Sequence, residues 1–137
     1  MTKLNIASLV LDHKAMDFPY KGKDHFVVTL TYTTSEKYAE LRSNCLTTKL
    51  DPESGYPQEV LDADKWSTEF CKQVIAGWKG LTYADLADIM LINESLIEDP
   101  SAEVEYSVEN AELLLKHSKE FDAWVNTKIT NLQFFRD

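Results

Sequence analysis

The sequence Gly77-Trp78-Lys79-Gly80 is the first stretch that could do chemistry, because closely spaced glycines often allow a backbone to bind phosphate. A loop of the P-loop type needs a longer glycine spacing and a lysine followed by serine or threonine ahead of a helix. Here Lys79 is followed by Gly80, and the residues before Gly77 have a helical pattern. The sequence therefore does not predict a phosphate site.

The other reactive residue types do not form a catalytic or metal-binding pattern. His13, His25 and His117 fall in three different elements, without a cysteine or carboxylate at zinc-ligand spacing. Asp85 and Asp88 share a helix face, although pairs of this kind are most often solvated. There is no GxSxG or HExxH motif and no twelve-residue calcium loop. We therefore expect no enzyme, and no catalytic, cofactor-binding or metal-binding residues.

Cysteine use and hydropathy indicate the compartment. Cys45 and Cys71 lie far apart without a CxxC motif, so we expect reduced, buried thiols in a cytoplasmic protein. No apolar run approaches the ~18 residues that a membrane span needs. The apolar run near the N-terminus is broken by Asn5 and Ser8 and lacks a convincing cleavage site, so we expect neither a signal peptide nor a membrane protein.

The net charge of −9 is concentrated in one part of the chain. Residues 80–115 contain nine acidic side chains and no basic one. Such a field repels nucleic-acid backbones and anionic lipids, and it favours a basic partner. The alternative is an acidic surface that only keeps the protein in solution.

With 137 residues, the chain has the length of one ordinary domain, residues 1–137, that can bury a sizeable core. Residues 26–33 alternate between apolar side chains and threonine, which is the clearest strand pattern in the sequence. Residues 4–11 also have a strand pattern, and residues 20–24 have turn chemistry. We expect the strands near 4–11 and 25–33 to form an N-terminal hairpin.

Helical spacing dominates the rest of the chain. A capping box at residues 33–36 predicts a first helix, a loop over 50–60 follows, and a second helix starts near Asp62 or Asp64. Residues 82–85 form another capping box, and Ser107 and Ser118 are N-caps for two more helices. The predicted fold class is therefore α+β and mostly helical, with the hairpin packed on about four or five helices.

The glycine pair is interpreted as a rigid corner between two of these helices. Gly77 or Gly80 ends the second helix, because glycine adopts the left-handed conformation without penalty. Trp78 then fills the angle between the helices, next to Leu81. A structural role for Gly77, Trp78, Gly80 and Leu81 is favoured over a direct contact with a ligand or partner.

Aromatic residues cluster near the C-terminus. Neighbouring residues of a helix point about 100° apart, so Phe134 and Phe135 cannot both face one core. One of them is a candidate for a contact with a partner or with a second copy of the chain. The candidate contact residues are Phe121, Trp124, Phe134 and Phe135. The alternative is a last turn that covers the hairpin.

The order of these features resembles that of the tail assembly chaperones of long-tailed bacteriophages, from about Phe26 to Phe135. The resemblance rests on FVVTLTY, EKYAELRSNC, VIAGWKGL and YSVENAELLLKHSKEFDAWV, followed by the aromatic tail. Its most specific parts are Gly77–Leu81 and the pair Glu109-Asn110 ahead of Leu114-Leu115.

The resemblance implies a non-enzymatic protein that coats the long, aggregation-prone tape measure protein while tail tube subunits are recruited. It implies the host cell cytoplasm as the location, and absence from the mature virion. Some members self-associate, so a homo-oligomer is an expectation as well. An acidic surface with an apolar groove suits an apolar-striped and often basic client.

Two other functions stay open on the sequence alone. The acidic stretch could mimic nucleic acid and inhibit a basic host enzyme, although apolar helix faces interrupt its acids. The chain could instead be a structural tail accessory protein, which would remain in the mature particle. Sequence physics does not separate such a component from a chaperone.

Overall fold

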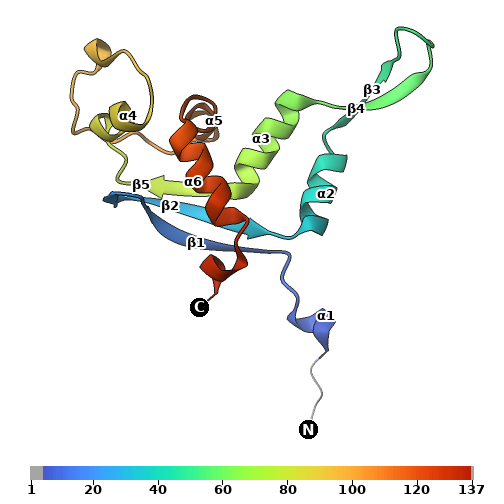
Figure 1. Ribbon diagram of the computed structural model, residues 1–137, viewed down its shortest axis with the longest axis horizontal. Helices are drawn as coiled ribbons and strands as arrows, with labels where there is room; N and C mark the ends of the chain where they lie inside the picture. The colour runs from blue at the N-terminus through green and yellow to red at the C-terminus, as the bar shows by residue number, and fades with distance from the viewer. Residues whose placement is uncertain (1–4, 137) are drawn as a thin grey trace.

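A computed structural model describes residues 5–136, and its centre is a three-stranded antiparallel sheet (Figure 1). The strand order is β1 (His13–Tyr20), β2 (Lys23–Thr33) and β5 (Ile75–Lys79), so β2 lies between the other two. The threonines of β2 alternate with Phe26, Val28 and Leu30, which are fully buried. The apolar period of two thus selects the central strand and its inner face.

A two-residue turn joins β1 to β2. Gly22 has a φ of 78°, a conformation that suits glycine, and the pairing runs from His13 with Thr33 to Tyr20 with Lys23. The register places Met16 opposite Leu30 and Phe18 opposite Val28, so apolar side chains share one face.

The helices begin where the sequence places hydrogen-bonding caps. They are α2 (Ser35–Ser43), α3 (Ala63–Val74), α4 (Tyr83–Ile89), α5 (Val108–His117) and α6 (Lys119–Ile129). Their N-caps are Thr34, Asp62, Thr82, Ser107 and Ser118, and each side chain accepts a hydrogen bond from a backbone N–H of the first turn. The predicted N-caps Ser107 and Ser118 and the capping box of Thr82 are confirmed, and the second helix starts at Asp62, one of its two predicted positions. The capping box predicted at residues 33–36 is displaced, because the N-cap is Thr34 and it binds the N–H of Lys37.

Four smaller parts lie around this body. The short helix α1 (Ile6–Leu9) precedes β1, and the two 3-10 turns are η1 (Glu94–Leu96) and η2 (Leu132–Phe135). Strands β3 (Leu46–Leu50) and β4 (Pro57–Leu61) form a separate two-stranded sheet, which projects from the body in Figure 1. Within residues 5–136, no helix combines the length and apolar character that crossing a membrane requires.

The core lies between the inner face of the sheet and helices α3, α5 and α6. Phe26 is its centre, because its ring contacts Tyr20 at 5.4 Å, Phe121 at 6.2 Å and Trp78 at 6.3 Å between ring centroids. Other fully buried members are Cys71, Val74, Ile75, Leu81, Ala111 and Val125.

The predicted fold class is wrong in two respects. Residues 6–9 form a helix and not a strand, so the true partner of β2 is β1 at residues 13–20; residues 1–4 lie outside the described part of the chain. Strands also occur well beyond the N-terminal hairpin, as β3, β4 and β5. The fold is α+β with two antiparallel sheets, because pairing partners far apart in sequence decide which short segments become strands.

The helix–corner–helix interpretation of the glycine pair is also wrong. Helix α3 ends at Val74, and the chain continues directly into β5, which contains Gly77 and Trp78 and pairs with β2. Gly80 ends this strand with a φ of 79°. Residues 75–79 pair instead with the edge of β2 that β1 leaves free, so the backbone groups that face β2 gain hydrogen-bond partners.

Gly80 passes so close to β2 that no side chain fits there. A Cβ at this position would lie 1.8 Å from the carbonyl oxygen of His25, whereas one at Gly22, which also has a positive φ, would meet nothing within 4 Å. Because Gly80 has no side chain, the turn before α4 packs directly against the backbone of β2.

We predict that Gly80→Ala destabilises the protein by more than ~3 kcal/mol, because a left-handed alanine costs ~1–2 kcal/mol and the clash adds to it. Gly22→Ala is the matched control. It is expected to cost only the ~1–2 kcal/mol of a left-handed alanine, because nothing lies close to its Cβ. Urea unfolding followed by tryptophan fluorescence measures both. Equal losses in the two variants would contradict the close approach of Gly80.

Candidate functional site

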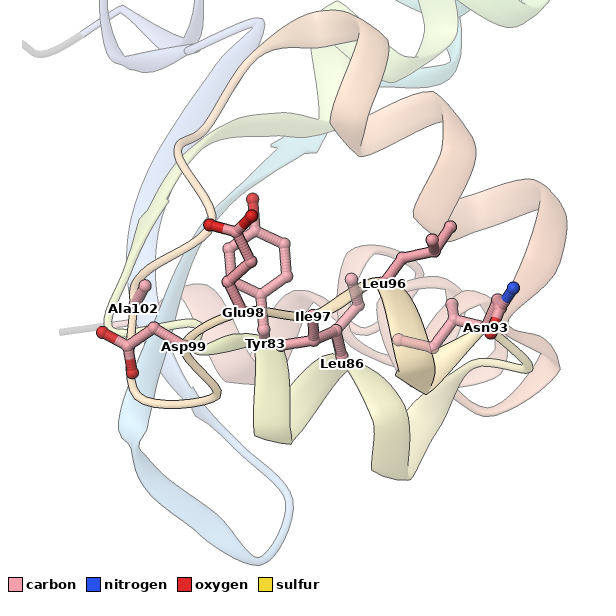
Figure 2. Close-up of a pocket in the computed structure, with 9 residues that line it drawn as sticks. Tyr83, Leu86, Asn93, Leu96, Ile97, Glu98, Asp99 and Ala102 are labelled. Carbon is pink, nitrogen blue, oxygen red and sulfur yellow. The ribbon is translucent and has the colours of Figure 1, made fainter.

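An open cavity lies between α4 and the segment 92–102 (Figure 2). Its volume is about 540 Å³, and its lining is mainly apolar. We call it the α4 pocket, and it is lined by Tyr83, Leu86, Ile92, Asn93, Leu96, Ile97, Glu98, Asp99 and Ala102. A volume in the range of ~300–1,000 Å³ is typical of ligand-binding sites.

Backbone hydrogen bonds attach segment 99–104 to the start of α4. The N–H groups of Tyr83 and Ala84 donate to the carbonyls of Ala102 and Pro100, at 3.1 and 3.0 Å. The N–H of Val104 donates to the carbonyl of Leu81 at 2.6 Å. The first N–H groups of α4, which have no partner within the helix, thus bind segment 99–104. This fixes the position of the pocket wall that the segment forms.

Asp85 attaches α4 to the β1–β2 hairpin. Its carboxylate contacts the ring Nε2 of His25 at 2.7 Å and the ammonium of Lys23 at 3.2 Å, and it accepts the N–H of Thr82 at 3.1 Å. Lys23 also contacts Asp88 at 2.8 Å. Because Asp85 is 6 % exposed, these partners replace most of the water that it has lost.

The pKa of Asp85 is lowered from 3.8 to about 2. Burial alone raises it, but the hydrogen bonds from the backbone of Thr82, from His25, from the Thr82 hydroxyl and from Lys23 outweigh burial. The carboxylate is therefore charged at every physiological pH, and its role is that of an anchor.

Asp85 and Asp88 share one lysine. Lys23 contacts both carboxylates and balances one of their two charges, and within residues 5–136 no group of three or more His, Cys, Asp or Glu side chains is arranged to hold a metal ion. The sequence places Asp85 and Asp88 three residues apart on one helix face. Their contact with Lys23, which is distant in the sequence, gives this pair a structural role.

The rim of the α4 pocket combines exposed apolar and acidic side chains. Leu96 is 77 % exposed and the nearby Leu91 is 98 % exposed, which is unusual for leucine. Glu98 and Asp99 belong to the lining, and Asp99 accepts hydrogen bonds from the hydroxyl and N–H of Ser101, which lower its pKa. The pocket therefore presents an uncovered apolar surface with negative charge around it.

The residues of the glycine corner lie behind this pocket and do not line it. Leu81 is fully buried, and the indole N–H of Trp78 donates to the carbonyl of Val104 at 2.9 Å. The ring of Trp78 also makes an edge contact with Tyr106. Gly77 and Trp78 border a smaller depression of about 220 Å³ on the outer face of the sheet.

The C-terminal aromatic residues lie in or next to the core. Phe121 and Phe135 are buried, so of the four candidates only Trp124 and Phe134 retain surface. Phe135 packs on Phe18 at 5.2 Å, and Phe134 lies under the ammonium of Lys128 at 3.9 Å. The structure thus brings both Phe121 and Trp78 into contact with Phe26, and none of these residues belongs to the lining of the α4 pocket.

Sequence reasoning missed the residues that line the pocket. Residues 93–106 have the composition of an acidic loop. Because carboxylates flank Leu96 and Ile97 in the sequence, these two residues do not form an apolar pattern. The available signal was an excess of leucine and isoleucine in a segment without helical period: Leu91, Ile92, Leu96 and Ile97.

The arrangement can bind apolar groups. No cysteine, serine, threonine, lysine or histidine belongs to the lining of the α4 pocket, and both cysteines are fully buried elsewhere. Burial, with a smaller effect of Glu112, raises the pKa of Cys71 to about 11, so its thiol stays protonated.

Comparison of the chain with protein-family models, curated proteins and solved structures gave no match.

We predict that Asp85→Asn destabilises the protein at pH 7 by ~2–3 kcal/mol, because Lys23 and the cap of α4 lose a charged partner. In the parent protein the folded pKa of Asp85 is below the unfolded value. Its contribution to stability is therefore complete above pH ~4 and is lost as the pH falls toward 2.

Urea unfolding at several pH values between 2 and 7 measures this prediction. The difference in unfolding free energy between the parent and Asp85→Asn is expected to shrink between pH ~4 and ~2. Asp88→Asn is the control, since Asp88 is exposed and shares only Lys23. A difference that stays constant over this interval would refute the anchoring role of the carboxylate.

Proposed function

We propose that this protein is a non-enzymatic assembly chaperone that binds an apolar helical segment of a client in the α4 pocket. The client is the tape measure protein of a long-tailed bacteriophage, and binding assists assembly of the tail tube. The observation that carries the proposal is an open apolar pocket with an acidic rim. The polar cluster beside it, Asp85 with Lys23 and His25, has a structural role and holds α4 on the hairpin.

The shape of the pocket suits the side chains of an amphipathic helix. Such a helix presents apolar residues at i, i+3, i+4 and i+7, and these enter a groove lined by apolar side chains. Leu86 on α4 and Leu96 and Ile97 on the opposite wall provide that lining (Figure 2). Exposed leucines at a pocket are costly in solution unless a partner covers them for part of the time.

The charge of the site favours a client with basic residues beside its apolar stripe. The acids at the rim lie in the part of the chain that has no basic residue, residues 80–115. Charges around an apolar contact steer association and reject acidic competitors, and they do so less well at high salt. Reversible binding of this kind fits a protein that must leave its client when tube subunits arrive.

The identity of the client and the location in the host cytoplasm follow from the resemblance to tail assembly chaperones, as does absence from the mature virion. The exposed apolar surface supports binding of a protein segment over mimicry of nucleic acid, because Leu91 and Leu96 interrupt the acidic surface. A structural accessory of the tail would use an equally apolar contact, but it would stay in the particle.

We predict that Leu96→Asp weakens client binding at least ~10-fold, because it places an unpaired charge in the apolar contact. Co-expression with the tape measure protein, followed by co-purification and a test of client solubility, measures this. Leu50→Asp is the matched control, since Leu50 is a similarly exposed leucine on the separate β3–β4 hairpin. It is expected to bind the client like the parent protein.

Three outcomes would overturn the proposal. Equal binding by the Leu96→Asp and Leu50→Asp proteins would remove the pocket from the contact. Co-purification of a basic host enzyme, with no effect on the solubility of the tape measure protein, would favour the acidic mimic. Recovery of the chain from purified mature particles would favour the structural accessory protein.

A further inference from the structure

The described N-terminal segment, residues 5–11, carries apolar side chains that no other described residue covers. Ile6, Leu9, Val10 and Leu11 are 60–78 % exposed, and no residue of this segment is buried. Its helix α1 is four residues long, far below the ~12 residues at which an isolated helix becomes even marginally stable in water. We call residues 5–11 the N-terminal arm; a binding partner would explain its apolar composition.

The arm cannot reach the α4 pocket of its own chain. The N–H of Thr34 donates to the carbonyl of Asp12 at 3.0 Å, which fixes the base of the arm at the far end of β2. The pocket lies beyond the other end, where Lys23 contacts α4. The eleven residues of β2 span ten steps along the strand, roughly 33 Å between the two ends. Figure 1 shows α1 and α4 on opposite sides of the molecule.

Even a fully extended arm of seven residues spans at most ~25 Å, which is less than the length of β2. An arm that occupies an α4 pocket must therefore come from a second copy of the chain. The two surfaces also complement each other in charge. Residues 1–11 contain one charged residue, Lys3, whereas Glu98 and Asp99 belong to the lining of the pocket.

We propose that the N-terminal arm of one copy binds in the α4 pocket of the next, with Ile6 and Leu9 against Leu86, Leu96 and Ile97. Donor and acceptor surfaces lie at opposite ends of the molecule, so the contact is heterologous and repeats head to tail. A repeat of this kind closes into a ring or continues as an open chain of subunits.

This contact uses the same pocket as the proposed function, but it does not depend on the identity of the client. It implies that the arm and the client compete, so that self-association covers the apolar pocket until a client displaces the arm. Competition by the arm lowers the apparent affinity for the client. This reduction grows with the concentration of the protein itself, because the arm comes from another copy. Removing the arm contact should thus leave client binding unchanged or tighter.

Cross-linking between two separately purified variants tests the contact directly. Leu9→Cys protein is mixed with Leu96→Cys protein and treated with a short bis-maleimide; Cys45 and Cys71 are fully buried and remain protected. A specific contact gives the introduced thiols an effective concentration near millimolar, so at micromolar protein we expect at least ~10-fold more mixed dimer than random collision gives. Leu9→Cys mixed with Leu50→Cys is the matched control. Equal yields in both mixtures would overturn the proposal.

Complementation by sedimentation velocity provides a second test. The parent protein is expected to associate with rising concentration, whereas Ile6→Asp and Leu96→Asp proteins each stay monomeric. A mixture of the two should form dimers and nothing larger, because it contains one intact arm and one intact pocket per pair. A monomeric parent at ~100 μM, or a mixture that stays monomeric, would refute the contact.

The two proposals fail in different ways. Ile6→Asp removes the arm and leaves the pocket intact, so this protein should still bind the client. If it binds the client while the parent protein does not self-associate, the arm contact is wrong and the proposed function stands. If the complementation succeeds while no variant binds the client, the proposed function is wrong and the arm contact stands.

Discussion

Burial of Phe26 is the interaction on which the rest of the structure depends. Its ring contacts Tyr20 from the neighbouring strand, Phe121 from α6 and Trp78 from β5, so it joins parts of the chain that lie up to 95 positions apart. A fully buried aromatic ring of this kind contributes ~3–5 kcal/mol by the cost of its truncation. The backbone just before it, at His25, is also the surface that Gly80 contacts. The aromatic cluster and the turn into α4 are therefore positioned by the same two residues of β2.

The α4 pocket lies outside this core, and its position follows from the core. Helix α4 starts three residues after Gly80, and the carboxylate of Asp85 connects it to Lys23 and His25 on the hairpin. The opposite wall is held by backbone hydrogen bonds and by the indole of Trp78. Each wall is thus attached to the sheet by polar contacts, so the apolar side chains between them remain free to bind something else. A pocket that relied on its own apolar contacts would close.

Negative charge and exposed leucine occur together in this region for a physical reason. Carboxylates keep an apolar surface in solution when no partner is bound, and they select partners of opposite charge. In the two proposals, the client helix and the N-terminal arm would each bring apolar side chains with little negative charge to this surface. Among the described residues, His13 and His25 contact carboxylates and lie away from the lining.

The sequence by itself determined the local features. Hydroxyl and carboxylate side chains at Asp62, Thr82, Ser107 and Ser118 satisfy the first free N–H groups of a helix, so the start of each helix depends only on nearby residues. The alternation over residues 26–33 likewise specified a strand and its buried face. Only the tertiary structure decided what these elements pair with. Residues 75–79 became a strand because β2 had a free edge, and residues 6–9 did not because β1 took the other edge. The pocket was hidden for the same reason: Leu86 and Leu96 form one surface only after Gly80 and Asp85 fix α4 against the hairpin, and that contact joins residues 60 positions apart.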